Sequence, residues 1–375
     1  MKTLIRSLLR TIWSVTPRRL KDVYKAISIK WRLHRNYAYD HKRYKRWSGL
    51  PVHEPSRINL RSLITMDYHR VEKGLSLAAP RPGFGKPTIV SLIRNLNQYL
   101  DRFGIDSHAI VATNALRAYS EFNRRHNATD ESIDKQIERL EERVKHSEVC
   151  HARGGIIELS REQIQNASTI DLTEFFASRH SIRSFSGKPV PRQLIERAVA
   201  MAQKTPSVCN RQAWRVYCFH DGDKKKAVLA HQNGNRGFGE QASWVLVVTC
   251  NLGHFVSVGE RNQAWIDGGM FAMSLLYALH SLGLGACPLN WSVEKETNEA
   301  LRKTAQLDEQ DATIMLIAVG HLPDNLCVAQ SPRKSLDEVI FFPDAPTQPS
   351  QRTEQKPPIR EEQESGAAEL ITIKK

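Results

Sequence analysis

Two arginines, a histidine and a serine stand close together near the middle of the chain. They are Arg179, His180, Ser181 and Arg183, in the stretch FFASRHSIRSFSGKPV. We expect a helix to end here and an extended segment to begin. Because charge-assisted hydrogen bonds are roughly twice as strong as neutral ones, such a group predicts a clamp for a phosphate and for hydroxyls attached to it.

A second stretch, TPSVCNRQAW, runs from Thr205 to Trp214. It is rich in turn-forming residues, carries the amides Asn210 and Gln212, and leads into an expected strand. Amide side chains both donate and accept hydrogen bonds, so a loop of this kind can reach the edge of a heteroaromatic ring. Either stretch alone is a weak signal, since most basic clusters and polar loops are solvated surface.

Together and in this order, the two stretches resemble the opening of the nitroreductase family. That family has an RRSIRxF-like motif followed by APSxxNxQPW, and this chain has RHSIRSF followed by TPSVCNRQAW. The resemblance continues through GNRGFGEQASWVLVVT, WIDGGMFAMSLLYALHSLGLGACPL, IAVGHLPD and SPRKSLDEVI, and so covers residues 171–340. It implies an α+β fold with a mainly antiparallel sheet flanked by helices.

The resemblance also implies contacts to an FMN cofactor. The residues that match such contacts are Arg179, His180, Ser181, Arg183, Pro206, Ser207, Asn210, Asn235, Pro288, Leu289, Asn290 and Arg333. The stretch near residue 180 would bind the phosphate, the ribityl chain and the pyrimidine edge, and the loop at 206–210 would come from the partner subunit of a homodimer. Asn235 would meet the flavin edge, residues 288–290 would form the loop beside the reactive N5 atom, and Arg333 would close on the phosphate.

The function implied is that of an FMN-dependent oxidoreductase with two half-reactions. NAD(P)H would reduce the flavin, and the reduced flavin would pass electrons to a small-molecule acceptor in the same pocket. Because the cofactor carries the chemistry, no side chain is expected to act as a catalytic residue, and no metal is required. The substrate and the choice between NADH and NADPH are beyond the sequence.

The chain departs from the family pattern in two places. Ala213 stands where the family usually has proline, and Asn290 with Trp291 replaces an acidic residue and a glycine found in several nitro-reducing members. We expect Trp291 to cover the flavin face, which disfavours nitroaromatic reduction. An enzyme that oxidises or fragments its substrate is therefore one alternative, and a non-catalytic, membrane-peripheral component of a surface-polysaccharide system is another.

The pattern of the chain predicts five segments. They are a basic, aromatic-rich helical arm at 1–55, a helical region at 56–150, a linker at 151–170, the FMN domain at 171–342 and a disordered tail at 343–375. The elements HRVEKGL and RPGFGK of the helical region resemble an extension found in family members from bacterial surface-polysaccharide gene clusters. The role of this region, as lid, dimer extension or docking domain, is left open.

Within the FMN domain, strands and helices alternate. Residues 194–203 form an amphipathic pattern typical of a helix. Residues 263–282 are apolar on nearly every face, which indicates a buried central helix. Apolar runs of strand length, rich in β-branched residues, lie at 214–220, 244–250 and 314–320.

Positive charge is concentrated in the arm. The net charge is +14, and residues 1–50 hold fourteen Lys and Arg against only Asp22 and Asp40, so the rest of the chain is nearly neutral. Without a nucleic-acid-binding motif, this distribution argues against nucleic acid as a partner. The arm either lies on an anionic membrane surface or packs one face on its own protein, and the sequence leaves both readings open.

The remaining motifs are expected to be structural. The six cysteines show no CxxC pair, which favours a reducing compartment, and no run of eighteen apolar residues or signal-peptide pattern is seen, so a cytoplasmic location is expected. Cys287 is expected to be a core residue. His69 and Glu72 share a helix face, but two ligands are too few for a metal site, so helix packing or a salt-bridged surface is the preferred interpretation.

Overall fold

The computed structural model describes most of the 375-residue chain. The described residues are 14, 16–50, 54–77, 79–145, 154–158, 160, 161, 165, 170–220, 222–329, 331 and 333–343. The predicted linker lies mostly outside them, as do residues 1–13 of the arm and residues 344–375 of the tail. Contacts divide the chain into a unit at Met1–Ala329 and a second at Gln330–Lys375, so the five predicted segments stay a prediction.

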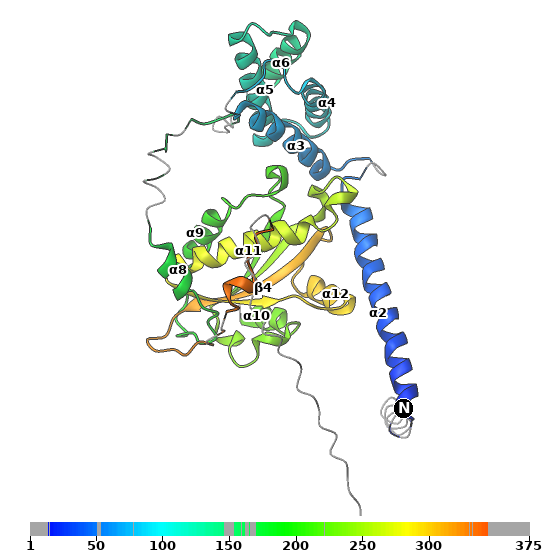
Figure 1. The fold of residues 1–375 in the computed structure, drawn as a ribbon, viewed down its shortest axis with the longest axis vertical. Coiled ribbons are helices and arrows are strands. Elements are labelled where there is room, and N and C mark those ends of the chain that lie inside the picture. Colours follow the sequence, from blue (N-terminus) through cyan, green and yellow to red (C-terminus); the bar gives the residue numbers. More distant parts are fainter. Residues whose placement is uncertain are drawn as a thin grey trace, which may run out of the picture. The chain divides into compact units, whose positions relative to one another are not determined.

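A four-stranded antiparallel sheet forms the centre of the first unit (Figure 1). Its strands follow the order β1-β2-β4-β3, and every neighbouring pair is antiparallel. The strands are β1 (Trp214–Phe219), β2 (Trp244–Asn251), β3 (Leu284–Asn290) and β4 (Asp311–His321). The α+β fold with an antiparallel sheet is therefore confirmed, and β2 is buried along its whole length because it lies inside the sheet with helices on both faces.

Strand β3 corrects the expectation for residues 288–290. These residues belong to a strand paired with β4, with Pro288 opposite Ile317, and they do not form a loop. Pro288 is tolerated because β3 is an edge strand, where a missing backbone N–H leaves no internal ladder bond unmade. A glycine- and alanine-rich run without β-branched residues gave no strand signal in the sequence.

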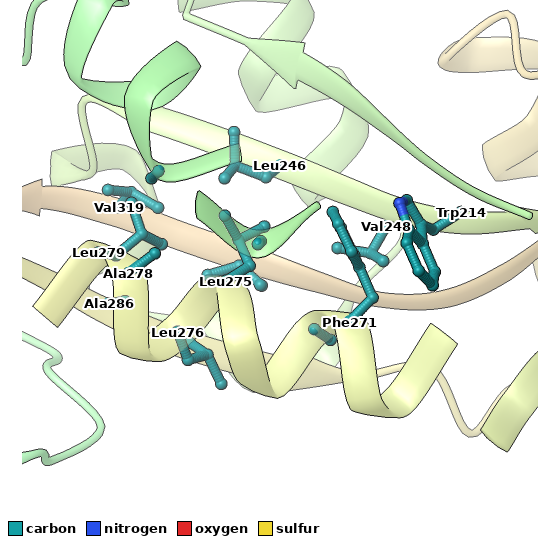
Figure 2. Packing of buried hydrophobic residues seen from close by; sticks show 14 of the residues in the cluster. Trp214, Leu246, Val248, Phe271, Leu275, Leu276, Ala278, Leu279, Ala286 and Val319 are labelled. Atoms are coloured by element: carbon teal, nitrogen blue, oxygen red, sulfur yellow. The ribbon is translucent and has the colours of Figure 1, made fainter. Parts of the chain in front are cut away.

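Helix α11 (Gln263–Ser281) lies across one face of the sheet, beside α9 (Arg192–Ala202). Its inner face packs Phe271, Leu275 and Leu279 against Leu246 and Val319 (Figure 2). Each such side chain, fully buried, contributes about 1.5–3 kcal/mol. The expected central helix is thus confirmed, although its outer face is not buried.

A close approach fixes α11 on the sheet at Gly268. A Cβ atom at this position would lie 2.6 Å from Cγ1 of Ile314 and 3.1 Å from the Cys250 sulfur. One helical turn further on, Phe271 stacks on Trp214 of β1 with ring centroids 4.9 Å apart. The absence of a side chain at Gly268 therefore sets how near the helix can come to the strands.

Two short helices cover the opposite face of the sheet. They are α10 (Gly222–Leu229) and α12 (Lys295–Thr304), which contribute Leu229 and Leu301 to a second core cluster with Val245 and Leu316. Inward side chains alternate along β2, so that Leu246 and Val248 face α11 while Val245 and Val247 face α10 and α12. The sheet is therefore the middle of three layers.

Residues 56–145 form four helices around a core of their own. The helices are α3 (Arg57–Leu75), α4 (Lys86–Phe103), α5 (Ser107–Arg125) and α6 (Glu131–Val144). Asp130 caps α6 by accepting the Ile133 N–H at 3.3 Å, and a loop with Pro82 and Gly83 separates α3 from α4. His69 Nδ1 lies 3.3 Å from Glu72 on α3, so the two side chains contact each other as their spacing predicted.

The basic arm forms the long helix α2 (Arg18–Trp47). Its C-terminal half packs on the first unit's sheet domain, because Tyr44 donates to the Ser257 carbonyl at 2.6 Å and Arg35 pairs with Glu296 at 2.8 Å. Tyr44 and Trp47 also reach the main core cluster. For the C-terminal half of α2, the structure therefore confirms the interpretation that one face of the arm packs on its own protein.

The described residues contain neither a helix that could cross a membrane nor a cluster of metal ligands. Among the described helices, none is long and apolar enough to cross a membrane. Across the same residues, no three His, Cys, Asp or Glu side chains gather in a way that could hold a metal ion.

Candidate functional site

The predicted phosphate clamp runs beside the open edge of the sheet. It follows α8 (Leu172–Ser178), and Arg179 is the extended residue at which that helix ends. The Ile182 N–H donates to the Ala286 carbonyl of β3 at 3.0 Å, and the Ser186 N–H donates to the His321 carbonyl at 3.0 Å. The chain therefore changes from helix to extended segment where the sequence predicted it.

Arg179 and His180 line a cavity of about 280 Å³ at this edge. Apolar side chains of α11, β3 and the segment after β4 form the rest of its wall, among them Leu276, Ala286 and Leu322. His280 also lines it and lies 2.9 Å, Nε2 to Oγ, from Ser178. Burial, followed by the charge of Arg179, lowers the pKa of His280, which favours the neutral ring. The cavity thus joins the Arg179 guanidinium and two imidazole rings to an apolar wall.

Ser181 and Arg183 lie on the same segment but outside that cavity. Ser181 is half-buried and Arg183 is exposed. The Arg183 guanidinium donates only to the Ser181 carbonyl, at 3.4 Å, among the described residues. Its remaining donors are therefore available to an anion.

A polar turn meets the other end of β3. Gln232 donates from Nε2 to the Asn290 carbonyl at 3.1 Å, which places the turn at 232–235 beside the last residue of the strand. The Asn235 amide nitrogen donates to the Leu229 carbonyl at 2.9 Å and to the Gln232 carbonyl. The predicted flavin-edge amide therefore uses its N–H groups to shape its own turn.

Along β3, alternate residues present their backbone to the open edge. The Ala286 carbonyl bonds the clamp segment and the Asn290 carbonyl bonds Gln232, so Pro288 between them faces the same way. Pro288 offers a carbonyl oxygen but no N–H. Clamp segment, strand and polar turn together form one continuous edge, which we call the β3 edge.

The amide loop is strained. Cys209, Asn210 and Gln212 have φ angles of 48°, 53° and 48°, in the left-handed region that non-glycine residues rarely occupy. Backbone strain of this kind persists only where surrounding contacts enforce it, and it clusters at functional sites. The Gln212 amide group lies 3.3 Å from Asn210 Oδ1, so the two predicted amides are neighbours.

This loop is held by Asp267, Arg211 and Glu260, which the sequence analysis did not identify as site residues. The Val208 N–H donates to the Asp267 carboxylate at 3.2 Å, and buried Arg211 binds Glu260 through two bonds, the longer being 3.1 Å. Burial raises the pKa of Asp267. Burial is the largest single influence on Glu260 and would raise its pKa, but the hydrogen bond and charge of Arg211 act together with the Val256 and Ser257 N–H groups, and the pKa is lowered.

The sequence did contain a signal for Asp267. It is the only carboxylate in an otherwise apolar helix, and a buried charge requires a partner. The identity of that partner could not be read from the sequence, because Val208 lies far away along the chain. Nothing comparable pointed to Glu260 or to His280.

One chain does not bring the amide loop and the clamp together. The loop is held at Asp267, near the start of α11, whereas the clamp cavity includes His280, near its end. With a rise of about 1.5 Å per residue, these two positions on the helix are about 20 Å apart. The residues from the amide loop and those of the β3 edge therefore form two separate groups in a single copy.

Arg333 belongs to the second unit, Gln330–Lys375. There its guanidinium donates to the Ser331 carbonyl at 2.5 Å. The short helix η6 (Leu336–Glu338) follows, and Lys334 pairs with Glu338 at 3.8 Å. The role expected of Arg333 remains a prediction.

Trp291 and Cys287 are both held in place. The Trp291 indole N–H donates to Asn298 of α12 at 2.9 Å, and the ring lines a small cavity together with Tyr39 of α2. Cys287 is buried, and burial raises the pKa of its thiol. Its reading as a core cysteine is confirmed.

The domain that carries these groups matches a known family. Residues 176–235 and 225–321 match the model of the Nitroreductase family. This part of the chain therefore matches the Nitroreductase family, and it is similar to oxidoreductases such as a 4-nitrobenzoate reductase.

Individual relatives are distant. A 4-nitrobenzoate reductase from Pseudomonas putida is 22% identical over 206 residues, covering 43% of this chain and 89% of that protein. An NADH dehydrogenase from Thermus thermophilus is 27% identical over 175 residues, covering 38% of this chain and 82% of that protein. The structure of an FMN-dependent nitroreductase from Clostridium difficile is 19% identical with a TM-score of 0.38, covering 44% of this chain and 96% of that one.

Proposed function

We propose that the nitroreductase-family domain binds FMN at the β3 edge and uses NAD(P)H to reduce a small-molecule acceptor. The observation that carries this proposal is the cavity in which Arg179 and His180 meet the apolar wall of α11 and β3. The similar protein from Thermus thermophilus is an NADH dehydrogenase, which supports a nicotinamide as the reductant. The acceptor is a small molecule of undefined identity.

The residues present fit FMN in their chemistry. The clamp offers cations for a phosphate, the Pro288 carbonyl offers an acceptor on the sheet edge, and the amide loop offers donors and acceptors for a ring edge. The cavity of about 280 Å³ falls just below the ~300–1,000 Å³ of typical ligand pockets, so one copy encloses only part of such a site. Clamp and amide loop must come from different copies to meet.

A homodimer would supply the missing half. If two copies pair along antiparallel α11 helices, the start of one helix lies beside the end of the other, and the amide loop of one copy reaches the clamp of its partner. The outer face of α11 supports this pairing because Trp265, Ile266 and Met270 are 45%, 53% and 39% exposed. Large apolar side chains exposed together on one helix favour a protein interface.

Each group of residues then has a defined task. When bound, FMN supplies the two-electron chemistry, taking hydride from NAD(P)H and passing it to the acceptor. Arg179, His180 and Arg183 bind the phosphate side, while Asn210 orients the pyrimidine edge. The apolar wall with Leu276 and Ala286 excludes water from the site, which strengthens the polar contacts inside it.

Replacing Arg179 with alanine tests the clamp. We expect FMN binding to weaken by about 1.5–3 kcal/mol, because a hydrogen bond to a charged group is lost. The measurement is a fluorescence titration of the apoprotein with FMN, together with the flavin absorbance of freshly purified protein. Arg197→Ala is the matched control, since Arg197 is an exposed arginine on α9 outside the cavity.

Equal FMN affinity in parent and Arg179→Ala would remove Arg179 from the site. A parent protein that takes up no flavin from excess FMN would refute the proposal as a whole. Anaerobic consumption of NAD(P)H separates the proposed reductase from an enzyme that oxidises its substrate, since the latter need not accept nicotinamide.

We also propose, as a second property, that α2 contacts an anionic membrane surface from the cytoplasmic side. Four large side chains recur at helical spacing on its N-terminal half, namely Leu20, Tyr24, Ile27 and Trp31. These four side chains are 59–62% exposed. Basic residues flank them, and each cation near an anionic surface contributes about 1 kcal/mol. The resemblance of the helical region to members from surface-polysaccharide gene clusters is consistent with work at a membrane.

Four substitutions to glutamine at these positions test the contact. Flotation with phosphatidylglycerol vesicles should fall at least tenfold, because burial of the apolar stripe is lost while every cation stays. Leu77→Gln, an exposed leucine at the end of α3, should change nothing. Unaltered flotation of the quadruple variant would contradict the membrane contact.

A further inference from the structure

A groove between α2 and α12 gathers positive charge away from the β3 edge. Its volume is about 560 Å³. Six cationic side chains line it, namely Lys42, Arg43, Arg46, Lys295, Arg302 and Lys303. Glu299 and Glu309 are the acidic residues of its lining, so the groove carries a clear excess of positive charge.

Most of these cations have no carboxylate partner. Lys295 pairs with Glu299 at 3.8 Å, and it is the only one of the six that forms an ion pair among the described residues. Lys42, Arg46 and Lys303 are exposed. Their charges are therefore directed to the groove and the solvent, without a neutralising side chain.

Two arginines converge at the floor of the groove. Arg43 donates to the Asp311 carbonyl at 2.7 Å, and Arg302 donates to the same oxygen at 2.6 Å. Burial and, after it, the charge of Arg302 lower the pKa of Arg43. The electrostatic repulsion between two like charges held this close is offset when an anion lies beside them.

Aromatic rings keep the cations in place. Tyr39 lies between Arg43, whose guanidinium carbon is 5.6 Å from the ring centroid, and Lys295, whose Nζ is 5.5 Å away. Arg46 lies over the Trp47 ring at 4.6 Å. Such cation–π contacts order the side chains, so less conformational entropy is lost when an anion binds.

We propose that this groove binds a phosphate-bearing ligand, with Lys42, Arg46 and Lys303 contacting the phosphate and Arg43 and Arg302 fixing the floor. Arginine and lysine together suit this chemistry, because guanidinium groups bind phosphate oxygens in pairs and ammonium groups act as point charges. The phosphate belongs either to a free diphosphate compound or to a lipid headgroup. The site is distinct from the proposed flavin site and does not rest on it.

The test uses the full chain and two probes. One is inorganic pyrophosphate, titrated calorimetrically at low salt. The other is a vesicle of phosphatidylglycerol and phosphatidylcholine, compared with phosphatidylcholine alone in a sedimentation assay. Binding should fall as salt rises, because exposed cations are screened.

The groove variant is K42Q/R46Q/K303Q, and the matched control is K73Q/R124Q/R125Q. The control removes the same number of positive charges from exposed helix-end residues outside the groove. Because each cation contributes about a fivefold effect near an anionic group, the groove variant should bind on the order of a hundredfold more weakly. If the triple variant does not fold, Lys42→Gln alone should give about a fivefold loss.

Each result has one meaning. Vesicle binding is compared in the background of the four glutamine substitutions on α2, so that the apolar stripe does not contribute. If the groove variant, but not the control, loses pyrophosphate binding, the proposal is supported and the ligand is a free phosphate compound. If it loses only vesicle binding, the proposal is supported and the ligand is a lipid headgroup. Parent protein that binds neither probe, or equal weakening in both variants, overturns it. Flavin content, measured on the same samples, should stay at the parent value and separates this outcome from failure of the flavin site.

Discussion

The helical region α3–α6 and the sheet domain each have a buried apolar core, but they differ in the polar and charged groups that surround it. In the helical region, polar side chains satisfy one another; Asp106 caps α5 and also accepts from Tyr99 at 2.6 Å and Arg57 at 3.1 Å. Among the described residues, the buried side-chain atoms without a hydrogen-bond partner are Arg35 Nε, Gln310 Oε1 and Thr313 Oγ1, none of them in α3–α6.

The sheet domain, in contrast, keeps strain and unpaired cations at its margins. The amide loop has three left-handed non-glycine residues in a row of four, and the clamp brings Arg179 and His180 to an apolar cavity. This contrast teaches that the chain tolerates unfavourable local structure at the places where we propose that the chemistry occurs.

The largest expected effect concerns the polar centre of the sheet domain. Asp311 is fully buried and accepts from Thr249 at 3.0 Å, Asn251 at 3.0 Å and Tyr217 at 2.8 Å. Asp311→Ala leaves these donors and Arg215 without their acceptor, so the free energy of unfolding should fall by about 3–5 kcal/mol. Urea denaturation followed by tryptophan fluorescence measures it.

Asp308→Ala is the control, since Asp308 binds the same Arg215 at 3.0 Å but is 37% exposed. A loss of only about 1 kcal/mol is expected there, because exposed ion pairs contribute little. Equal losses in the two variants would show that burial does not set the cost.

The next largest effect is a loss of stability in the helical region alone. Leu92 of α4 is fully buried in the helical region, and Leu92→Ala should lower the free energy of unfolding of that region by about 3 kcal/mol through lost packing and a cavity. FMN affinity should not change, because no residue of α3–α6 lines the clamp cavity. Loss of flavin binding in a folded Leu92→Ala protein would contradict the view that the helical region does not contribute to the FMN site.

The smallest effect lies at the contact between the two regions. His254, in the turn η4 (Leu252–His254), lies 3.2 Å from Ser62 of α3, and burial together with the charges of Arg215 and Arg211 lowers its pKa to about 3. The unfolded chain therefore binds a proton on this ring at a higher pH than the native one does, so stability falls as pH drops below about 6.5 toward 3.

Between pH 7 and pH 5 this histidine alone should cost about 2 kcal/mol of stability. His254→Gln should reduce the pH dependence of the unfolding free energy by that amount, whereas His126→Gln, at an exposed position, should leave it unchanged. A pH dependence identical in all three proteins would exclude a role for His254.

Much of the fold followed from local patterns. Apolar runs rich in β-branched residues predicted β1, β2 and the later part of β4, since such side chains pack well on a pleated surface. The first residues of β4 were missed because Asp311 becomes a buried strand residue only through partners on β1 and β2. β3 was missed for a related reason: its strand character comes from pairing with β4, and its own residues show no preference for it.

In the candidate site, too, local stretches could be predicted from the sequence, and contacts between distant residues could not. Order and spacing of motifs predicted the clamp and the amide loop, because these are single continuous stretches. The groups that hold them, Asp267, Glu260 and His280, come from distant parts of the chain and are determined by tertiary packing. Sequence also could not show that clamp and loop lie at opposite ends of α11, a fact that makes a second copy part of the proposal.

The proline in β3 has a consequence for association of the protein with itself. An open sheet edge with regular N–H and C=O groups is a template on which further strands can add, and this is a common route to aggregation. Pro288 removes a donor from the middle of that edge, and the clamp segment and Gln232 already use the carbonyls at either end. The exposed border of the sheet is thereby protected against strand-by-strand growth and can still receive a ligand of limited size.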